Sequence, residues 1–159
     1  MSDKEQIKFM NMAIEKASEN VKTGKGGPFG AVIVKNGKVI AATGNTVFET
    51  YDPTAHAEVA AIRLACNELK SVTLEGCEIY ASCEPCPMCL SAIYWAKIDK
   101  LYYAATKEDA SAAGFDDTFL YKEIALNPGK RSLNTQHFMH QEALVSFEEW
   151  KRKLNIDDI

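Results

Sequence analysis

The feature that most constrains the fold is a set of metal-binding side chains divided between two short segments. His56 stands in the first segment, and Cys86 and Cys89 stand in the second, Pro85-Cys86-Pro87-Met88-Cys89. One histidine and two cysteines form a three-ligand zinc set, which leaves the fourth tetrahedral position open for water, as in catalytic zinc sites. The fold must therefore bring together two segments that lie far apart in the sequence.

Each part of this set has a simpler explanation when it is taken alone. A Cys-x-x-Cys pair can be a redox pair or half of a structural zinc site, and an isolated histidine is more often structural. A closed structural site would need a fourth protein ligand, for which Cys83 is the plausible candidate. The occurrence of all three ligands in this order favours a catalytic zinc site.

Periodicity and turn residues predict the N-terminal half of the chain. Apolar residues recur at helical spacing over about residues 4–22, and glycines end that stretch. Two short runs, 29–34 and 39–42, flank Asn36-Gly37. Because Asn-Gly between two such runs favours a type I′ turn, we expect two antiparallel strands joined by a hairpin.

The rest of the chain alternates helices and strands. We expect a helix that enters at Asp52-Pro53-Thr54 and ends near Leu69, and a last helix that starts at Ser146 with Glu149 in a capping box. Between them we expect strands over 77–82 and 101–104 and helices over 87–97 and 106–113. This order predicts an α/β fold, a three-layer α/β/α sandwich with a central mixed sheet of about five strands.

Glu58 stands two residues after the first zinc ligand. Positions i and i+2 do not share a helical face, so Glu58 reaches a metal-bound water only if His56 lies at or before the first turn of its helix. The alternative role is a solvated first-turn carboxylate that favours the helix dipole. Beside a zinc set, we expect Glu58 to accept and deliver protons.

Composition limits the class of protein. The chain has 159 residues, of which 47% are apolar and 25% are charged, and this composition indicates one globular domain. The net charge of −4 indicates that no surface is built mainly for nucleic-acid phosphates. Five cysteines cannot all pair, and neither a signal region nor a run long enough to span a membrane is present. We therefore expect a cytoplasmic protein without a membrane partner.

The sequence alone leaves the roles of several further residues undecided. Asn45 follows the second strand, where its amide can read the edge of a heterocycle or simply form a turn. Phe29 and Trp95 can stack on a base or fill the core. Asp116-Asp117 follows Gly114-Phe115 and can act in a site or cap the next helix.

Two motifs of this sequence together resemble those of a known family. The combination His-x-Glu and Pro-Cys-x-x-Cys is the signature of zinc-dependent nucleobase deaminases. The chain resembles the cytidine deaminase superfamily, and most of all its short bacterial guanine deaminases, to about Lys122. The segments that carry the resemblance are 27–34, 52–58, 82–89, 92–96 and 113–117.

The resemblance implies a role for each matching residue. His56, Cys86 and Cys89 would hold Zn²⁺, and Glu58 would move protons. The purine pocket would be lined by Asn45, the backbone at Ala57, Phe29 and Trp95, with Asp117 as a purine contact and a second catalytic proton relay. The family also implies a homodimer whose C-terminal segment, about 126–159, is exchanged and closes the partner's site. Where an aromatic end is implied, this chain ends Asn155-Ile156-Asp157-Asp158-Ile159.

The expected activity is the hydrolytic deamination of guanine to xanthine and ammonia, with a small purine as substrate and no nucleic acid as partner. The alternatives are a tRNA adenosine deaminase, which shares both zinc motifs, and a deaminase of another amino-substituted heterocycle. A third possibility from a different class is a non-catalytic module in which zinc only joins two helices. Acidic groups at a mouth repel a phosphate backbone, so the net charge argues against the tRNA substrate.

Overall fold

The computed structural model describes residues 2–154. The chain divides into two compact units, with the boundary between Phe119 and Leu120. The helices and strands of the first unit are α1 (Asp3–Thr23), β1 (Gly30–Lys35), β2 (Lys38–Gly44), α2 (Val47–Thr50), α3 (Ala57–Leu69), β3 (Cys77–Cys83), α4 (Pro87–Trp95), β4 (Lys100–Ala105) and α5 (Lys107–Ala112). Helix α6 (Thr118–Ala125) spans the boundary, and η1 (Pro128–Lys130) and α7 (His140–Leu154) follow. That residues 1–159 act as one deaminase domain stays a prediction.

The predicted hairpin is confirmed. Asn36 and Gly37 have φ angles of 51° and 75°, the left-handed conformation that a type I′ turn requires at both central residues. β1 and β2 then pair antiparallel, from Lys35 opposite Lys38 to Gly30 opposite Gly44. This hairpin forms one side of the sheet.

The sheet is mixed, as predicted, with the strand order β2-β1-β3-β4. β1 runs antiparallel to β3, and β3 runs parallel to β4. The prediction of about five strands is wrong by one, because the described part of the chain contains four. The chain turns into α5 directly after β4, where Thr106 Oγ1 accepts a hydrogen bond from the Asp109 backbone N–H and the Asp109 carboxylate accepts one from the Thr106 N–H.

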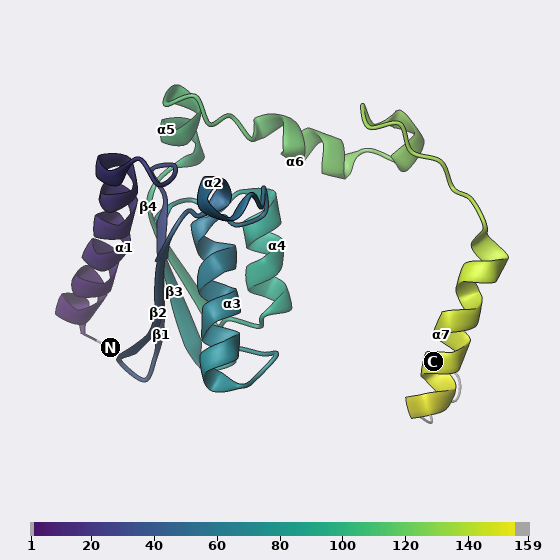
Figure 1. The fold of residues 1–159 in the computed structure, drawn as a ribbon, viewed down its shortest axis with the longest axis horizontal. Helices are drawn as coiled ribbons and strands as arrows, with labels where there is room; N and C mark the ends of the chain where they lie inside the picture. The colour runs from purple at the N-terminus through teal and green to yellow at the C-terminus, as the bar shows by residue number, and fades with distance from the viewer. Residues whose placement is uncertain (1, 155–159) are drawn as a thin grey trace. The chain divides into compact units, whose positions relative to one another are not determined.

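The three predicted layers are present. Figure 1 shows α1 on one face of the sheet and α3 and α4 on the other. Side chains alternate along β1: Ala31 and Ile33 pack in one buried cluster with residues of α3, and Val32 and Val34 pack in another with Phe9 of α1. Because both faces of β1 are covered, its run is apolar without alternation.

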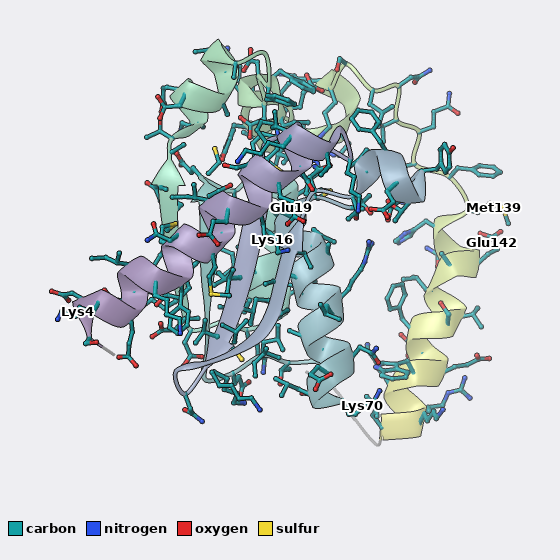
Figure 2. All side chains as sticks on the ribbon, turned by 60° about the vertical axis from the view of Figure 1, so that its left-hand side comes forward. Lys4, Lys16, Glu19, Lys70, Met139 and Glu142 are labelled. Atoms are coloured by element: carbon teal, nitrogen blue, oxygen red, sulfur yellow. The ribbon has the colours of Figure 1, made fainter. Side chains whose placement is uncertain are left out.

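α1 shows how the sequence sets a helix on this sheet. Its start is capped by Ser2, whose backbone N–H donates to Glu5 Oε2 at 2.9 Å, and its end is marked by Gly24 in the left-handed conformation. Figure 2 labels Lys16 and Glu19, which form an exposed ion pair on the helix, with 2.9 Å between Nζ and Oε2. The opposite face buries Phe9, among other residues, against the sheet.

Two predicted helix starts are wrong. The second long helix begins at Ala57, not at Asp52, because the Asp52 carboxylate accepts hydrogen bonds from the Thr54 backbone N–H and hydroxyl and closes a turn there. The last helix begins at His140, and Ser146 lies inside it, where its hydroxyl donates to the Ala143 carbonyl at 3.0 Å. Side chains that bond to local backbone groups can thus resemble a helix start without being one.

The second unit has a different character. Between residues 120 and 154 no side chain is buried, and local hydrogen bonds hold the turns: Arg131 Nε donates to the carbonyls of Glu123 and Leu126, and Glu123 Oε2 accepts from Ser132. Figure 2 labels Met139 and Glu142 at the start of α7. Within residues 2–154 no helix is both long enough and apolar enough to cross a membrane.

Candidate active site

Two of the predicted metal ligands occupy the same position in two different helices. His56 is the N-cap of α3 and Cys86 is the N-cap of α4, each with extended backbone angles. Their carbonyls accept the first intrahelical hydrogen bonds, from Ala60 and Leu90, both at 2.9 Å. Pro87 follows at the first helical position, as predicted. Neither His56 nor Cys86 uses its side chain to cap its own helix.

The three ligand atoms converge. His56 Nδ1 lies 3.6 Å from Cys86 Sγ and 3.5 Å from Cys89 Sγ, and all three atoms lie within 4.8 Å of one another. A tetrahedral zinc with Zn–S bonds of about 2.3 Å and a Zn–N bond of about 2.0 Å separates sulfur from nitrogen by about 3.5 Å. The donor set and its spacing therefore fit zinc.

The protonation of the metal-free cluster follows from its hydrogen bonds. Hydrogen bonds from the Cys89 thiol and from His56 lower the pKa of the Cys86 thiol to about 4. The hydrogen bond to Cys86, with burial, raises the pKa of the Cys89 thiol, and the hydrogen bond to Cys86 raises the pKa of His56. The three groups are thus coupled to one another by hydrogen bonds, and zinc binding requires both thiols to be deprotonated.

Cys83 stands apart from the ligand cluster. Its thiol donates to the Thr106 carbonyl at 3.5 Å, and burial raises its pKa to about 11. In the part of the chain that the structure describes, it is not a member of the group that could hold a metal ion. The geometry therefore favours three protein ligands, not the closed site that a purely structural zinc would need.

Glu58 lies where its predicted role requires. Because His56 is the N-cap, Glu58 is the second residue of α3, still in the first turn, and its side chain is 7% exposed. Burial raises the pKa of its carboxyl group. A carboxyl group whose pKa is raised in this way is suited to accept and return a proton.

A cavity of about 350 Å³ opens beside the cluster, within the first unit. Its lining includes six residues that the sequence singles out: Phe29, Asn45, His56, Glu58, Cys86 and Asp117. Cys89 lies behind the lining as a fully buried ligand. The volume lies at the lower end of the range for small-molecule sites, which suits a single heterocyclic base.

Two residues that were predicted to line the pocket lie outside the cavity lining. Trp95, at the end of α4, is 86% exposed and does not line the cavity. Ala57 is fully buried and also outside the lining, and its carbonyl accepts a hydrogen bond from the Thr43 hydroxyl at 2.8 Å. The Ala57 backbone N–H, at the first position of α3, belongs to the helix-start donors that lack an intrahelical partner.

Asn45 forms the turn that the sequence allowed and also lines the cavity, while its contact with a heterocycle stays a prediction. It forms the predicted turn, since its Oδ1 accepts from the Val47 backbone N–H at 3.2 Å, and its own N–H donates to the Phe29 carbonyl at 3.0 Å. It is also 8% exposed and lines the cavity. Its side-chain amide therefore has a fixed orientation beside the space that a ligand would occupy.

Both residues of the acidic pair line the cavity. Asp116 Oδ1 also accepts from the Thr118 backbone N–H at 2.9 Å and closes a turn before α6, and burial raises the pKa of the Asp117 carboxyl. Next to them, the ring of Phe115 meets that of Phe29 edge-on, with centroids 5.0 Å apart. Phe115 thus forms part of the wall.

The sequence missed a group of wall residues, which includes Val47, Phe48, Glu84, Lys107, Ala110 and Phe115. Glu84 Oε2 accepts from the Lys107 backbone N–H at 3.2 Å, which ties the segment before the cysteines to the start of α5. The position of Glu84 two residues before Cys86 was a usable signal. Val47 and Ala110 gave none, because apolar residues in short helices carry no chemical pattern.

The comparisons with known proteins agree with this geometry. Residues 3–105 match the family model described as the cytidine and deoxycytidylate deaminase zinc-binding region. A guanine deaminase of Bacillus subtilis is 50% identical over 147 residues, which are 92% of this chain and 94% of that protein. A tRNA-specific adenosine deaminase of Aquifex aeolicus is 36% identical over 147 residues, 92% and 93% of the two chains.

Solved structures of guanine deaminases share the fold of this chain. The X-ray structure of guanine deaminase from Bacillus subtilis superposes with a TM-score of 0.91 at 47% identity and covers 99% of each chain. A guanine deaminase structure from Nitrosomonas europaea gives a TM-score of 0.65 at 35% identity, over 69% of this chain and 64% of the other.

Proposed function

Since this chain belongs to the cytidine and deoxycytidylate deaminase family, we propose that it is a zinc-dependent hydrolase that converts guanine and water to xanthine and ammonia. The observation that carries the proposal is the His56, Cys86 and Cys89 cluster in one cavity with a buried Glu58. The choice of guanine is supported by the identity of 50% to a guanine deaminase, against 36% to a tRNA-specific adenosine deaminase over an equal length.

In the proposed mechanism, His56, Cys86 and Cys89 hold the metal. Zinc, when bound, lowers the pKa of a water and so supplies the nucleophile at neutral pH. Glu58 accepts a proton as the water oxygen bonds to the carbon that bears the amino group, and it delivers that proton to the adjacent ring nitrogen. The second proton of the water stays on the new hydroxyl group until Glu58 or Asp117 moves it to the amino group, which leaves as ammonia when the carbon–nitrogen bond breaks and the carbonyl forms.

The remaining wall residues orient the base. Phe29 and Phe115 provide aromatic faces, and Asn45 provides an amide that can donate to an acceptor atom on the purine edge. The Ala57 N–H is a further donor at the positive end of α3. A cavity that already holds Glu58, Glu84 and Asp117 favours a neutral base over a polyphosphate strand.

We also propose that the enzyme is a homodimer that exchanges its C-terminal segment. The support is the apolar face of α7, where Phe147 and Trp150 are 63% and 57% exposed. The implied contact of the last residues with the partner's site falls on residues 155–159, outside the described residues. A cytoplasmic location fits the five free cysteines, since thiols stay reduced in the cytosol, and the proposed conversion of guanine is a step of purine metabolism.

The proposal is tested by a substrate screen with ammonia release as the measurement. Guanine, guanosine, adenine, cytosine and a tRNA anticodon hairpin are compared at equal enzyme concentration and at two salt concentrations. Guanine should be turned over fastest, with little dependence on salt. Strong activity on the hairpin that falls steeply with salt would instead identify a tRNA adenosine deaminase, because phosphate contacts are salt-dependent.

The metal is tested separately on the purified protein, which should contain about one zinc per chain. Cys86→Ala should lose both zinc and activity, and Cys83→Ala is the matched control that should keep its zinc. Full activity of a zinc-free preparation would refute the proposal. Zinc loss in Cys83→Ala would point to the closed structural site instead.

A further inference from the structure

One buried polar side chain beside the cavity lies outside every motif. Asn20 stands in the last turn of α1, and its side chain is 8% exposed. Its Nδ2 donates to the Asn45 carbonyl at 2.7 Å and to the Gly27 carbonyl at 3.3 Å. Both amide hydrogens are therefore used on backbone carbonyls of two other segments.

These two segments form part of the cavity wall. Gly27 and Asn45 both line the cavity, and so does Phe29, whose carbonyl accepts the Asn45 backbone N–H. The Asn20 amide thus connects two segments of the cavity wall, one at Gly27 and one at Asn45, to the end of α1. It acts on the backbone of Asn45, while Val47 fixes the side-chain oxygen of Asn45.

The surrounding backbone leaves room for this amide. A Cβ added to Gly44 would lie 2.5–2.7 Å from Oδ1, Nδ2 and Cγ of Asn20. A Cβ added to Gly26 would lie 2.3 Å from the Asn45 carbonyl oxygen and 3.0 Å from Asn20 Nδ2. Any larger residue at either glycine would displace the amide or the carbonyl that it binds.

We propose that Asn20 is a positioning residue of the substrate pocket: its amide fixes the backbone of Gly27 and Asn45 so that the Asn45 side chain meets the base in one orientation. The inference rests on the proposed function, because it assumes that Asn45 reads the base. A shift of about 1 Å in a positioning group can cost about a hundredfold in kcat/KM, and the loss falls on KM when the group already contacts the base in the bound complex, as Asn45 would. Loss of the Asn20 donors should therefore weaken the use of guanine without any change at the metal.

The test uses four variants of the zinc-loaded protein. Asn20→Asp keeps the shape but replaces two donors by acceptors that face two carbonyls. Asn20→Ala with Gly44→Ala removes the amide and refills the space that it leaves. Asn20→Ala alone shows the combined effect of losing the hydrogen bonds and losing the packing of the amide. Thr23→Ala is the matched control, since the Thr23 hydroxyl bonds within α1, to the Glu19 carbonyl at 2.7 Å.

The expected result is a 10- to 100-fold fall in kcat/KM for guanine in the three Asn20 variants, mainly through KM, with zinc content unchanged. Thr23→Ala should match the parent protein. Refilling the space should raise the melting temperature above that of Asn20→Ala without restoring KM, because packing returns and the hydrogen bonds do not. If Asn20→Asp does not fold, the refilled double variant carries the test.

A double-mutant cycle separates positioning from general support. If Asn20 acts through Asn45, Asn20→Ala should change kcat/KM much less in an Asn45→Ala background than in the parent protein. Additive effects, or an unchanged KM in the refilled variant, would overturn the inference. Failure of the proposed function looks different, because the parent protein itself would then not deaminate guanine.

Discussion

The first and last long helices, α1 and α7, have similar patterns and opposite environments. α1 has 21 residues and α7 has 15, and both carry apolar residues along one face. α1 buries Phe9 to 2% exposure against the sheet, whereas Phe147 of α7 is 63% exposed. The amphipathic pattern predicts that one face of a helix will pack against another surface, but it does not say whether that surface belongs to the same chain.

This contrast has a consequence for how the molecule is built. All residues that line the cavity lie in the first unit, whose sheet and long helices are held together by two buried clusters. The second unit has no buried side chain between residues 120 and 154, and in the proposed homodimer its apolar face would contact the second copy. Chemistry should therefore respond to substitutions in the first unit, and association to substitutions in the second.

The largest effect should come from Glu58→Gln. The amide cannot accept the proton, so turnover of guanine should fall about 10²- to 10⁴-fold while zinc stays bound. Glu68→Gln, an exposed position of the same helix, is the control and should keep its activity. Loss of zinc in Glu58→Gln, measured by metal analysis, would make Glu58 a ligand and contradict the assignment.

The comparison of the two helices is tested directly by a matched pair, Phe9→Ala and Phe147→Ala. Phe9→Ala leaves a cavity between α1 and the sheet and should lower the free energy of unfolding by about 3–5 kcal/mol. Phe147→Ala should change unfolding of dilute protein by less than about 0.5 kcal/mol, because the ring loses few contacts within its own chain.

The two variants should also differ in association. Sedimentation over a range of concentrations should show weaker dimers for Phe147→Ala and unchanged dimers for folded Phe9→Ala. An equally large loss of unfolding free energy in Phe147→Ala at low concentration would show that α7 packs within its own chain. The proposed exchange would then be wrong.

The smallest effect concerns the turn before His56. Hydrogen bonds from Thr54, with the Arg63 guanidinium, hold the pKa of the Asp52 carboxyl below its ordinary value of 3.8. A pKa lowered by folding means that the carboxylate stabilises the folded state above the unfolded pKa, and that this contribution is lost as the pH falls through the folded pKa.

Asp52→Asn should accordingly have a lower melting temperature than the parent protein at pH 7. The difference in melting temperature should shrink as the pH falls below 3.8, because protonation of Asp52 then removes from the parent protein the charge that Asp52→Asn lacks at every pH. Thermal unfolding at several pH values measures it. A difference that stays constant down to pH 2 would contradict the role of the charge.

The sequence predicted those parts of the fold and site that depend on local chemistry. Asn36-Gly37 favoured the type I′ turn that the structure has, and the three predicted ligands converge as a metal site requires. The start of α3 was mispredicted because Asp52 has the side chain of a helix cap but bonds to Thr54 in a turn. Whether a capping residue is followed by a helix depends on contacts that local sequence does not contain.

The wall of the cavity was predicted only where a residue carries a distinctive group. Asn45 and Asp117 have such groups, whereas Phe115 reaches the site because its ring contacts Phe29, far away in the sequence. Trp95 looked like a stacking residue by type, but α4 leaves it at the surface. Asn20 was invisible for the opposite reason, since an asparagine near a helix end is ordinary until its partners are known.

The use of both helix N-caps as metal ligands sets function against stability. Ser, Thr, Asn or Asp at such a position stabilises a helix by about 0.5–2 kcal/mol relative to Ala, because its side chain accepts a free backbone N–H. His56 and Cys86 make no such bond. Selection for a stable fold alone would place other residues at both positions. Bound zinc would itself stabilise the folded state and would offset the two missing caps, so a capping residue at either position should raise the melting temperature only in comparison with the metal-free protein.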